Sequence, residues 1–432
     1  MAENFTKSPA TMPQRKCTKT KANVTSPLKR ITLPIAMEQY RAIVDDCHAY
    51  REWLNEMIAQ HPELFPQAIA SGYTLHDDRS SSKMTDVHLR RICLKARDAE
   101  GKKQVFTIAP SGVMPYLAGY TDEVEKAFFL RRFGVPFWAL SYVFGHDDDY
   151  WYRMENQLGH YNLVQTTVKD PEKLPKHLLA DEKITWLNGE EVVVATTVGN
   201  DCVLGASVAL GADTENLTEA YQHFKDEAQQ VKPDYAPETV NTDGWAATQR
   251  AWLTLFLLIV IIECFLHAFL KIRERGRHLK EVFRQLSQQV WDVYRATDAT
   301  SFRSKAEELR QWAEKNTTGY VWEAVSKLCA KVDRFVLAYD HPLAHRTSNM
   351  LDRYMNPMSR WLDSARLFHG HWVSAERSAR AWALLHNFQP YCPRSKVSQQ
   401  FSSPAHKLNG FVYHQNWLHN LLISTSMSGV SP

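Results

Sequence analysis

The chain has 432 residues, of which 44% are hydrophobic, 23% charged and 11% aromatic, and its formal net charge is +3. This composition provides enough apolar surface to offset the entropy lost when the backbone is ordered, so it excludes an intrinsically disordered protein. At roughly 150 residues per domain, the length predicts two or three domains. The small net charge neither requires nor excludes a polyanionic partner, because such binding depends on where basic residues cluster.

Residues 1–34 predict a flexible basic arm. Seven Lys and Arg residues lie in this segment against a single acid, Glu3. Such an arm either contacts phosphates without sequence specificity or is a solvated tail. It lacks the apolar core of a secretion signal, and the seven cysteines of the chain form no Cys-x-x-Cys pair. Both features predict a cytoplasmic protein.

The next segment predicts a helix and a hairpin. Residues 35–60 place apolar side chains at helical spacing, and Pro62 closes this helix. A polar loop at residues 76–82 leads to an alternating segment, residues 87–96, which returns through residues 104–109 as a β-hairpin.

Three short helices are predicted over residues 121–159. They are separated by glycines and span residues 122–133, 137–144 and 148–158. This spacing is typical of a helix-turn-helix, in which one helix enters the major groove of DNA. Three arginines could then meet phosphates or bases: Arg131, Arg132 and Arg153. The acids at residues 147–149 would repel the DNA backbone, and an ordinary three-helix packing unit remains the alternative. On the first interpretation, residues 35–160 form a mainly helical DNA-binding region.

The central part of the chain changes from helical to strand periodicity. Strands are predicted at residues 178–182, 191–197, 202–210, 239–243 and 257–264. Helices are predicted at residues 216–231 and 245–256. Three antiparallel strands followed by alternating helix and strand predict a mixed sheet that helices cover on both faces.

One apolar run, residues 252–270, approaches the length of a membrane span. Glu263 and His267 interrupt it, and its centre, residues 257–262, is short and β-branched, as in a buried parallel strand. We therefore expect no membrane segment. The following residues, 267–340, are helical in pattern and predict an inserted helical subdomain. Its start is rich in basic residues: Lys271, Arg273, Arg275, Arg277, His278 and Lys280.

Acidic residues at strand ends are the candidate site. Asp181 lies in the first central strand, and Asp243 ends a strand just before Gly244. Ligands bind at the carboxyl ends of strands in open α/β sheets, so these two carboxylates could share a cation. Asp352, in a helix that Thr347 or Ser348 would open, is the predicted third acid. Its rivals are Asp340, Glu323, Asp363 and Glu376.

Three carboxylates suit a pair of Mg²⁺ or Mn²⁺ ions, which can activate a nucleophile and stabilise a leaving oxygen in phosphodiester cleavage. Cys264 and His267 lie three residues apart, but zinc needs further ligands at comparable spacing and none stands out. These two residues are therefore predicted to be a packing pair.

With these residues the chain resembles the DDE-type transposases of bacterial insertion sequences, in the Mutator-like and hAT-like group. That group carries a Cys-x-x-His signature after the second Asp, which Cys264 and His267 match here. The resemblance extends over about residues 121–428, and residues 178–182, 344–349 and 381–388 look like those of such a transposase. The family usually has Glu at the third position, where this chain has Asp352, although Arg346 and Asn349 fit the local pattern.

The resemblance implies an α/β fold with a ribonuclease-H-like mixed sheet at residues 175–266 and 341–390, the inserted helical subdomain, and a C-terminal segment at residues 391–432. It implies that Asp181, Asp243 and Asp352 hold two Mg²⁺ or Mn²⁺ ions. These would cut the ends of a mobile genetic element and join them to target DNA.

Several further properties follow from the same resemblance. The N-terminal region would recognise terminal inverted repeats of double-stranded DNA, and pairing two ends would favour a homo-oligomer. The protein would act in the cytoplasm, associated with the nucleoid. Basic side chains would face the DNA backbone: Arg346, Arg353 and Arg360. The alternatives are an inactive DNA-binding protein derived from a transposase and a stand-alone metal-dependent nuclease.

Overall fold

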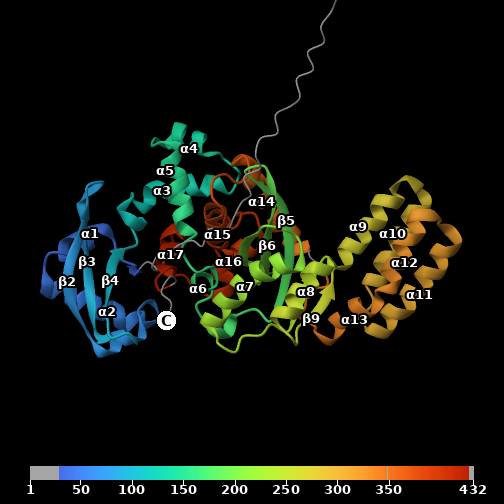
Figure 1. The fold of residues 1–432 in the computed structure, drawn as a ribbon, viewed down its shortest axis with the longest axis horizontal. Helices are drawn as coiled ribbons and strands as arrows, with labels where there is room; N and C mark the ends of the chain where they lie inside the picture. The colour runs from blue at the N-terminus through green and yellow to red at the C-terminus, as the bar shows by residue number, and fades with distance from the viewer. Residues whose placement is uncertain (1–28, 348, 428–432) are drawn as a thin grey trace, which may run out of the picture.

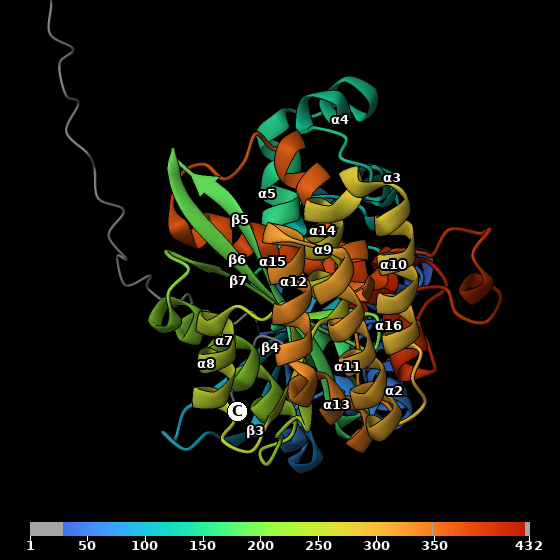
Figure 2. The same ribbon diagram turned by 90° about the vertical axis from the view of Figure 1, so that its right-hand side faces the viewer.

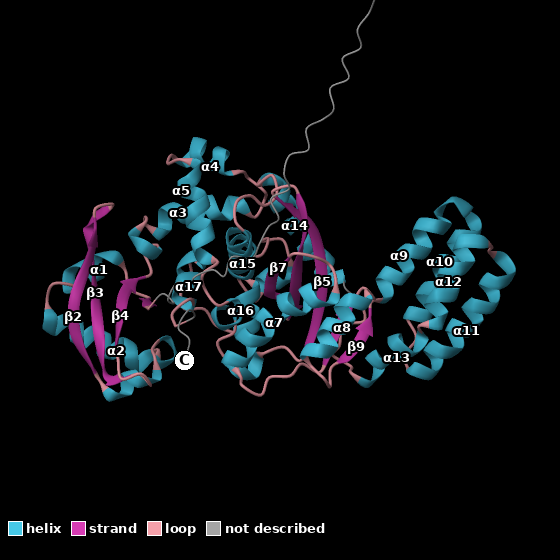
Figure 3. Ribbon diagram, in the orientation of Figure 1, coloured by secondary structure: helices cyan, strands magenta, loops and turns pink. Residues whose placement is uncertain are grey.

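The computed structural model describes residues 29–347 and 349–427, except for the side chains of residues 349–352 (Figure 1). Most of the predicted basic arm lies outside this part of the chain. The described residues form two mixed sheets with helices between and around them (Figure 3), which confirms the mixed α/β class. No helix in the described residues is long and apolar enough to cross a membrane.

The N-terminal unit contains a four-stranded sheet beside its helices, whereas the sequence predicted a mainly helical region with one hairpin. Its strands run in the order β1-β4-β3-β2. They are β1 (Arg30–Leu33), β2 (Tyr73–Ser81), β3 (Met84–Arg97) and β4 (Lys103–Pro110). The β3–β4 hairpin was predicted, whereas β2 was expected to be a loop. Because β2 is an edge strand with mostly exposed side chains, it lacks the apolar alternation that identifies a strand.

Two helices accompany this sheet where the sequence predicted one. They are α1 (Met37–Ile43) and α2 (Cys47–Gln60). The break comes at Asp46, whose carboxylate accepts hydrogen bonds from the backbone N–H groups of His48 (2.8 Å) and Ala49 (3.1 Å). Asp46 therefore begins a new helix within the predicted one.

The three helices predicted over residues 121–159 are present. They are α3 (Thr121–Arg131), α4 (Phe137–Phe144) and α5 (Asp148–Leu158). Phe128, Trp151 and Leu158 share one buried cluster with residues of the central sheet and of the helix α15 (Trp372–Phe388). These helices therefore help to cover the central sheet.

The central sheet has the strand order β7-β6-β5-β8-β9. Its strands are β5 (His177–Leu187), β6 (Glu190–Gly199), β7 (Cys202–Ala209), β8 (Thr239–Thr242) and β9 (Val260–Glu263). Strand β6 pairs antiparallel with both β5 and β7, whereas β8 pairs parallel with β5, and β9 pairs parallel with β8. This is the predicted chain order and the predicted mixed sheet.

The last of these strands is shorter and more exposed than predicted. Strand β9 lies at the edge of the sheet, and it begins at Val260. Leu257 and Leu258, expected inside a buried strand, lie in the preceding turn with 85% and 93% of their surface exposed. An edge strand needs only a short apolar segment, so hydrophobicity alone placed its start too early.

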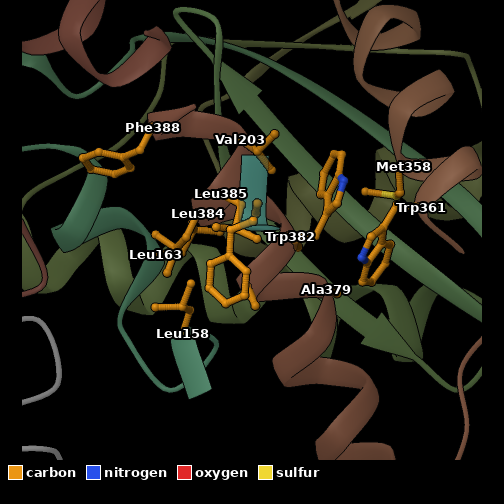
Figure 4. Packing of buried hydrophobic residues seen from close by; sticks show 14 of the residues in the cluster. Leu158, Leu163, Val203, Met358, Trp361, Ala379, Trp382, Leu384, Leu385 and Phe388 are labelled. Carbon is orange, nitrogen blue, oxygen red and sulfur yellow. The ribbon is translucent and has the colours of Figure 1, made fainter. Parts of the chain in front are cut away.

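Helices cover both faces of the central sheet. On one face lie α7 (Thr214–Val231) and α8 (Ala246–Leu255), with Asp213 rather than Thr214 capping α7. On the other face lie α14 (Asn349–Ser364) and α15, whose residues Trp361 and Trp382 approach to a ring separation of 6.2 Å (Figure 4). Pro357 was expected to shorten or kink its helix; α14 continues past it to Ser364, so the proline does not shorten it.

The predicted helical subdomain is present between β9 and α14, with an apolar core of its own (Figure 2). Its helices are α9 (Phe265–Gly276), α10 (Glu281–Tyr294), α11 (Ala299–Asn316), α12 (Gly319–Ala330) and α13 (Val332–Asp340). The remaining α-helices are α6 (Leu163–Thr167), α16 (Pro404–Asn409) and α17 (Trp417–Ser424). Short 3₁₀ helices occur at Pro62–Leu64, Gln67–Ser71, Pro115–Leu117, Pro171–Lys173, Arg277–Leu279 and Lys396–Gln399.

Candidate active site

Asp181 and Asp243 lie on neighbouring parallel strands. Strand β5 pairs with β8 from His177 to Leu179, where Leu179 is opposite Asn241. Continuing this register by two residues brings Asp181 level with Asp243, just beyond the end of β8. Both carboxylates act electrostatically on the same two groups, Glu182 and His267. The structure thus brings together the two acids that the sequence selected.

Local hydrogen bonds orient each of these acids. The Asp243 carboxylate accepts a hydrogen bond from the backbone N–H of Trp245 (2.8 Å), which closes the turn after β8. The Asp181 carboxylate accepts one from the N–H of Glu182 (2.9 Å). Both side chains are partly buried, so they are shielded but remain accessible to a ligand.

Glu182 is an acid that the sequence analysis did not select. Strand alternation points it to the opposite face from Asp181, where it accepts hydrogen bonds from the hydroxyls of Tyr221 (2.6 Å) and Thr248 (2.7 Å). The pKa of Glu182 is raised to about 7, mainly by burial and to a smaller extent by the charges of Asp181 and Asp243, while the two hydrogen bonds oppose the shift. In the sequence, only its position next to Asp181 in the strand could have marked Glu182 as a candidate site residue.

Cys264 and His267 join the second acid to the helical subdomain. The backbone N–H of Cys264 donates to the carbonyl of Thr242 (2.7 Å), directly before Asp243. A hydrogen bond with Cys264 raises the pKa of His267 to about 9, and Asp181 and Asp243 add to this shift while burial opposes it. The predicted packing pair therefore also places a cationic imidazole near the two carboxylates.

Glu263 is a second acid that sequence analysis passed over, noting only that it interrupts an apolar run. It ends β9 and is buried, with 3% of its surface exposed. Its carboxylate pairs with Lys331 and lies 3.6 Å from Arg334, both in or beside α13. This charge is thus compensated within the protein, and it fastens the helical subdomain to the sheet.

The third predicted acid, Asp352, lies in the first turn of α14, but its side chain is outside the described part of the chain. Helix α14 packs on the face of β5 that carries Asp181, because Tyr354 and Met358 share a buried cluster with Leu179. Asp352 therefore stays a prediction, on a helix that covers the same face of β5 as Asp181.

Two of its rivals are engaged elsewhere. Glu376 accepts a hydrogen bond from the N–H of Val208 (2.6 Å) on β7, at the other edge of the sheet. Glu323 pairs with Lys327 inside the helical subdomain.

The six predicted DNA-binding arginines fall into two groups. Three are exposed: Arg153, Arg353 and Arg360. The other three make contacts within the protein: Arg131, Arg132 and Arg346.

The contacts of the second group are structural. Arg131 is 2% exposed and pairs with Glu155 (2.6 Å), so the prediction that it reaches DNA does not fit its burial. Arg346 lies 4.7 Å from each of two ring centres, those of Tyr294 and Tyr339, and fastens the helical subdomain. Arg132 donates to the carbonyl of Pro390.

The paired carboxylates suit a hard divalent cation in their chemistry. Asp oxygens are the ligands that Mg²⁺ and Mn²⁺ prefer. Among the side chains that the structure describes, no group of three or more His, Cys, Asp or Glu residues is placed to hold a metal ion. Asp181 and Asp243 can therefore supply two of the ligands of a metal ion. A third protein ligand would have to come from a side chain that the structure does not describe.

Comparison with known proteins identifies no family. No protein-family model matches the chain, and no curated protein matches it.

Proposed function

We propose that this chain is a DDE-type transposase with a ribonuclease-H-like catalytic core. The observation that carries the proposal is the position of Asp181, level with Asp243 on the adjacent parallel strand. The order β7-β6-β5-β8-β9, with three antiparallel strands followed by two parallel ones, supports this core. The helical subdomain between β9 and α14 lies where the resemblance expects an insertion.

Asp181 and Asp243 would hold the metal ions, with Asp352 as the third ligand. When bound, such ions supply positive charge to the phosphodiester and lower the pKa of a coordinated water. The contribution of the chain is to fix the two carboxylates by the turn at Trp245 and by the strand pairing of β5 with β8. His267 offsets the repulsion between two carboxylates held close together.

DNA would be bound by basic side chains around this site. Arg353 and Arg360 are exposed on α14, and Arg153 is exposed on α5, where it pairs with Asp149 (3.1 Å). Recognition of terminal inverted repeats is assigned to the region before Gly159. Because two element ends must be cut together, the active complex would be a homo-oligomer on nucleoid DNA.

The test is cleavage of labelled duplexes made from the DNA that flanks the coding sequence. With Mg²⁺ or Mn²⁺ the wild-type chain should nick these duplexes and join their 3′ ends to a target plasmid. Asp181→Asn and Asp243→Asn should each lower the rate by on the order of 100-fold or more, since each removes a charge that the transition state needs. Asp234→Asn, an exposed acid on a loop, is the matched control and should cut normally.

Each alternative predicts a different result. Cutting without joining would indicate a stand-alone nuclease, and binding without cutting an inactive derivative. Equal cleavage by the wild type and by Asp243→Asn would refute the assignment. Full activity of Asp352→Asn would refute only the third ligand.

A further inference from the structure

The end of α9 carries a concentrated positive charge. Residues 271–280 contain five Lys and Arg residues and one acid, Glu274. Four of the five cations are exposed: Lys271, Arg273, Arg277 and Lys280. Within the described residues no acid lies in ion-pair contact with these four, whereas Arg275 lies 3.8 Å from Glu323. An exposed patch of uncompensated like charge attracts a polyanion.

The direction of α9 connects this patch with the candidate active site. The helix buries Phe265, Phe269 and Ile272 in the core of the helical subdomain. At 3.6 residues per turn, His267 and Lys271 lie one above the other on the opposite side of the helix. His267 is within electrostatic reach of Asp181 and Asp243. The basic residues therefore begin one turn beyond His267. Arg273 follows on another side of α9, and Arg277 and Lys280 come just after the helix ends at Gly276.

The position of α9 in the molecule agrees with this arrangement. Figure 1 shows α9 on the side of the helical subdomain nearest to the central sheet. With a rise of about 1.5 Å per residue, the end of α9 at Gly276 lies roughly 14 Å along the helix from His267. One DNA strand places a phosphate about every 3.4 Å along the duplex axis, so this length corresponds to roughly four base pairs.

The surface beside the patch is hollowed. A hollow of about 640 Å³ is lined by Arg275, His278 and Tyr320, among other residues. The Arg275 guanidinium lies over the ring of Tyr320, which is 76% exposed. Arg and Tyr side chains are among the groups that bind phosphate and sugar oxygens of DNA.

We propose that the basic segment from Lys271 to Lys280, which comprises the end of α9 and the 3₁₀ turn after it, binds the phosphate backbone of duplex DNA about four base pairs from the cleavage site. This inference rests on the proposed function, since that function makes DNA the substrate. The surface contributes affinity and alignment, while the acids carry out the cleavage. It adds a contact region that includes none of the six arginines predicted from the sequence.

The test measures DNA binding separately from cleavage. The full chain and the triple variant Lys271→Gln, Arg277→Gln, Lys280→Gln are titrated with a fluorescent 30-base-pair duplex in EDTA at several KCl concentrations. Each lost phosphate contact should lower the slope of log affinity against log salt by about 0.9, so the triple variant should lose roughly 2 to 3 in slope. Circular dichroism and thermal unfolding check that the variant is folded.

A matched control removes the same charge elsewhere in the subdomain. Arg295, Arg303 and Arg310 are each paired with an acid, so their replacement by Gln should leave the slope nearly unchanged. An equal loss of slope in both triple variants would overturn the inference, because it would show a net-charge effect. An unchanged slope in the Lys271 variant would overturn it too, and would redirect the search to an acidic protein partner.

The two proposals can fail independently. If Asp243→Asn abolishes cleavage while the α9 variant binds DNA like the wild type, the surface assignment is wrong and the transposase assignment stands. If the α9 variant loses slope but the wild type never cuts DNA, the surface assignment stands and the transposase assignment is wrong.

Discussion

Gly244 controls the turn that presents Asp243. Its φ angle is +91°, a left-handed conformation that favours glycine. A Cβ atom at this position would lie 2.4 Å from Oε1 of the buried Glu263. The turn therefore needs a residue without a side chain for two reasons, one conformational and one steric. The steric reason comes from the neighbouring strand, because Glu263 on β9 pairs with Thr242 on β8.

We expect Gly244→Ala to destabilise the protein by roughly 1–3 kcal/mol and to lower any metal-dependent cleavage. Urea unfolding measures the free energy of unfolding. Gly101→Ala is the matched control, because Gly101 also has a positive φ (+77°) but nothing within 4 Å of the added Cβ. If Gly244→Ala lowers the free energy of unfolding no more than Gly101→Ala does, the Glu263 side chain moves aside and the steric argument is wrong.

At the scale of elements, α17 connects the N-terminal unit to the central core. Leu418 and Leu421 belong to the buried cluster of the central sheet, whereas Ile423 belongs to that of the N-terminal sheet. Ser426, just after the helix, donates to the carbonyl of Thr32 (3.0 Å) and accepts from its N–H (2.9 Å). A short C-terminal helix thus contributes to two cores and covers the free edge of β1.

Ile423→Ala should cost about 2–5 kcal/mol, because it removes a fully buried side chain from the N-terminal core. Hydrogen exchange should rise in β1 and β4 more than in β5 or β6. Leu343→Ala, at a position 81% exposed, is the control and should change stability by no more than about 0.5 kcal/mol. If hydrogen exchange rises equally in both sheets, Ile423 does not stabilise the N-terminal sheet in particular, and the prediction is wrong.

Acid sensitivity is a property of the whole molecule. Burial lowers the pKa of His386 to about 3, and Arg132 contributes in the same direction while Asp201 opposes it. The ring nitrogen Nε2 is buried without a hydrogen-bond partner among the described residues, and the ring stacks on Trp382. In the unfolded chain the same imidazole has a pKa near 6.5. Between these values only the unfolded chain binds the proton, so stability falls as pH falls.

We expect the free energy of unfolding to decrease from pH 7 to pH 4, and His386→Phe to reduce this decrease. Phenylalanine keeps the stacked ring and removes the titrating group. Urea unfolding of both proteins at several pH values measures the two slopes, and other buried groups, such as His160, contribute equally to both. If the free energy of unfolding depends on pH in the same way in both proteins, the pKa of His386 does not differ between the folded and the unfolded chain, and the prediction is wrong.

Local patterns predicted a large part of this molecule. The helices α3, α4 and α5 and the antiparallel strands of the central sheet follow from glycine breaks and β-branched alternation, because each depends on near neighbours in the chain. Strand β2 and the start of β9 were misjudged, because an edge strand is defined by pairing rather than by hydrophobicity. Similarly, Arg131 and Arg346 look like DNA contacts in the sequence, and only packing shows Glu155 and two tyrosines as their partners.

The order of the central elements, and the positions of Asp181 and Asp243 in and just after apolar strands, can be read from the sequence alone, because both depend on residues that are close together in the chain. Only the tertiary structure shows which residues the pairing of β5 with β8 places side by side, and which charged side chains have a partner of opposite charge. Glu263 illustrates the difference. Its sequence position resembles that of Asp243, but Lys331 and Arg334 come from a helix more than 60 residues away and neutralise it. Whether a carboxylate is available to a metal ion depends on neighbours that only the fold brings together.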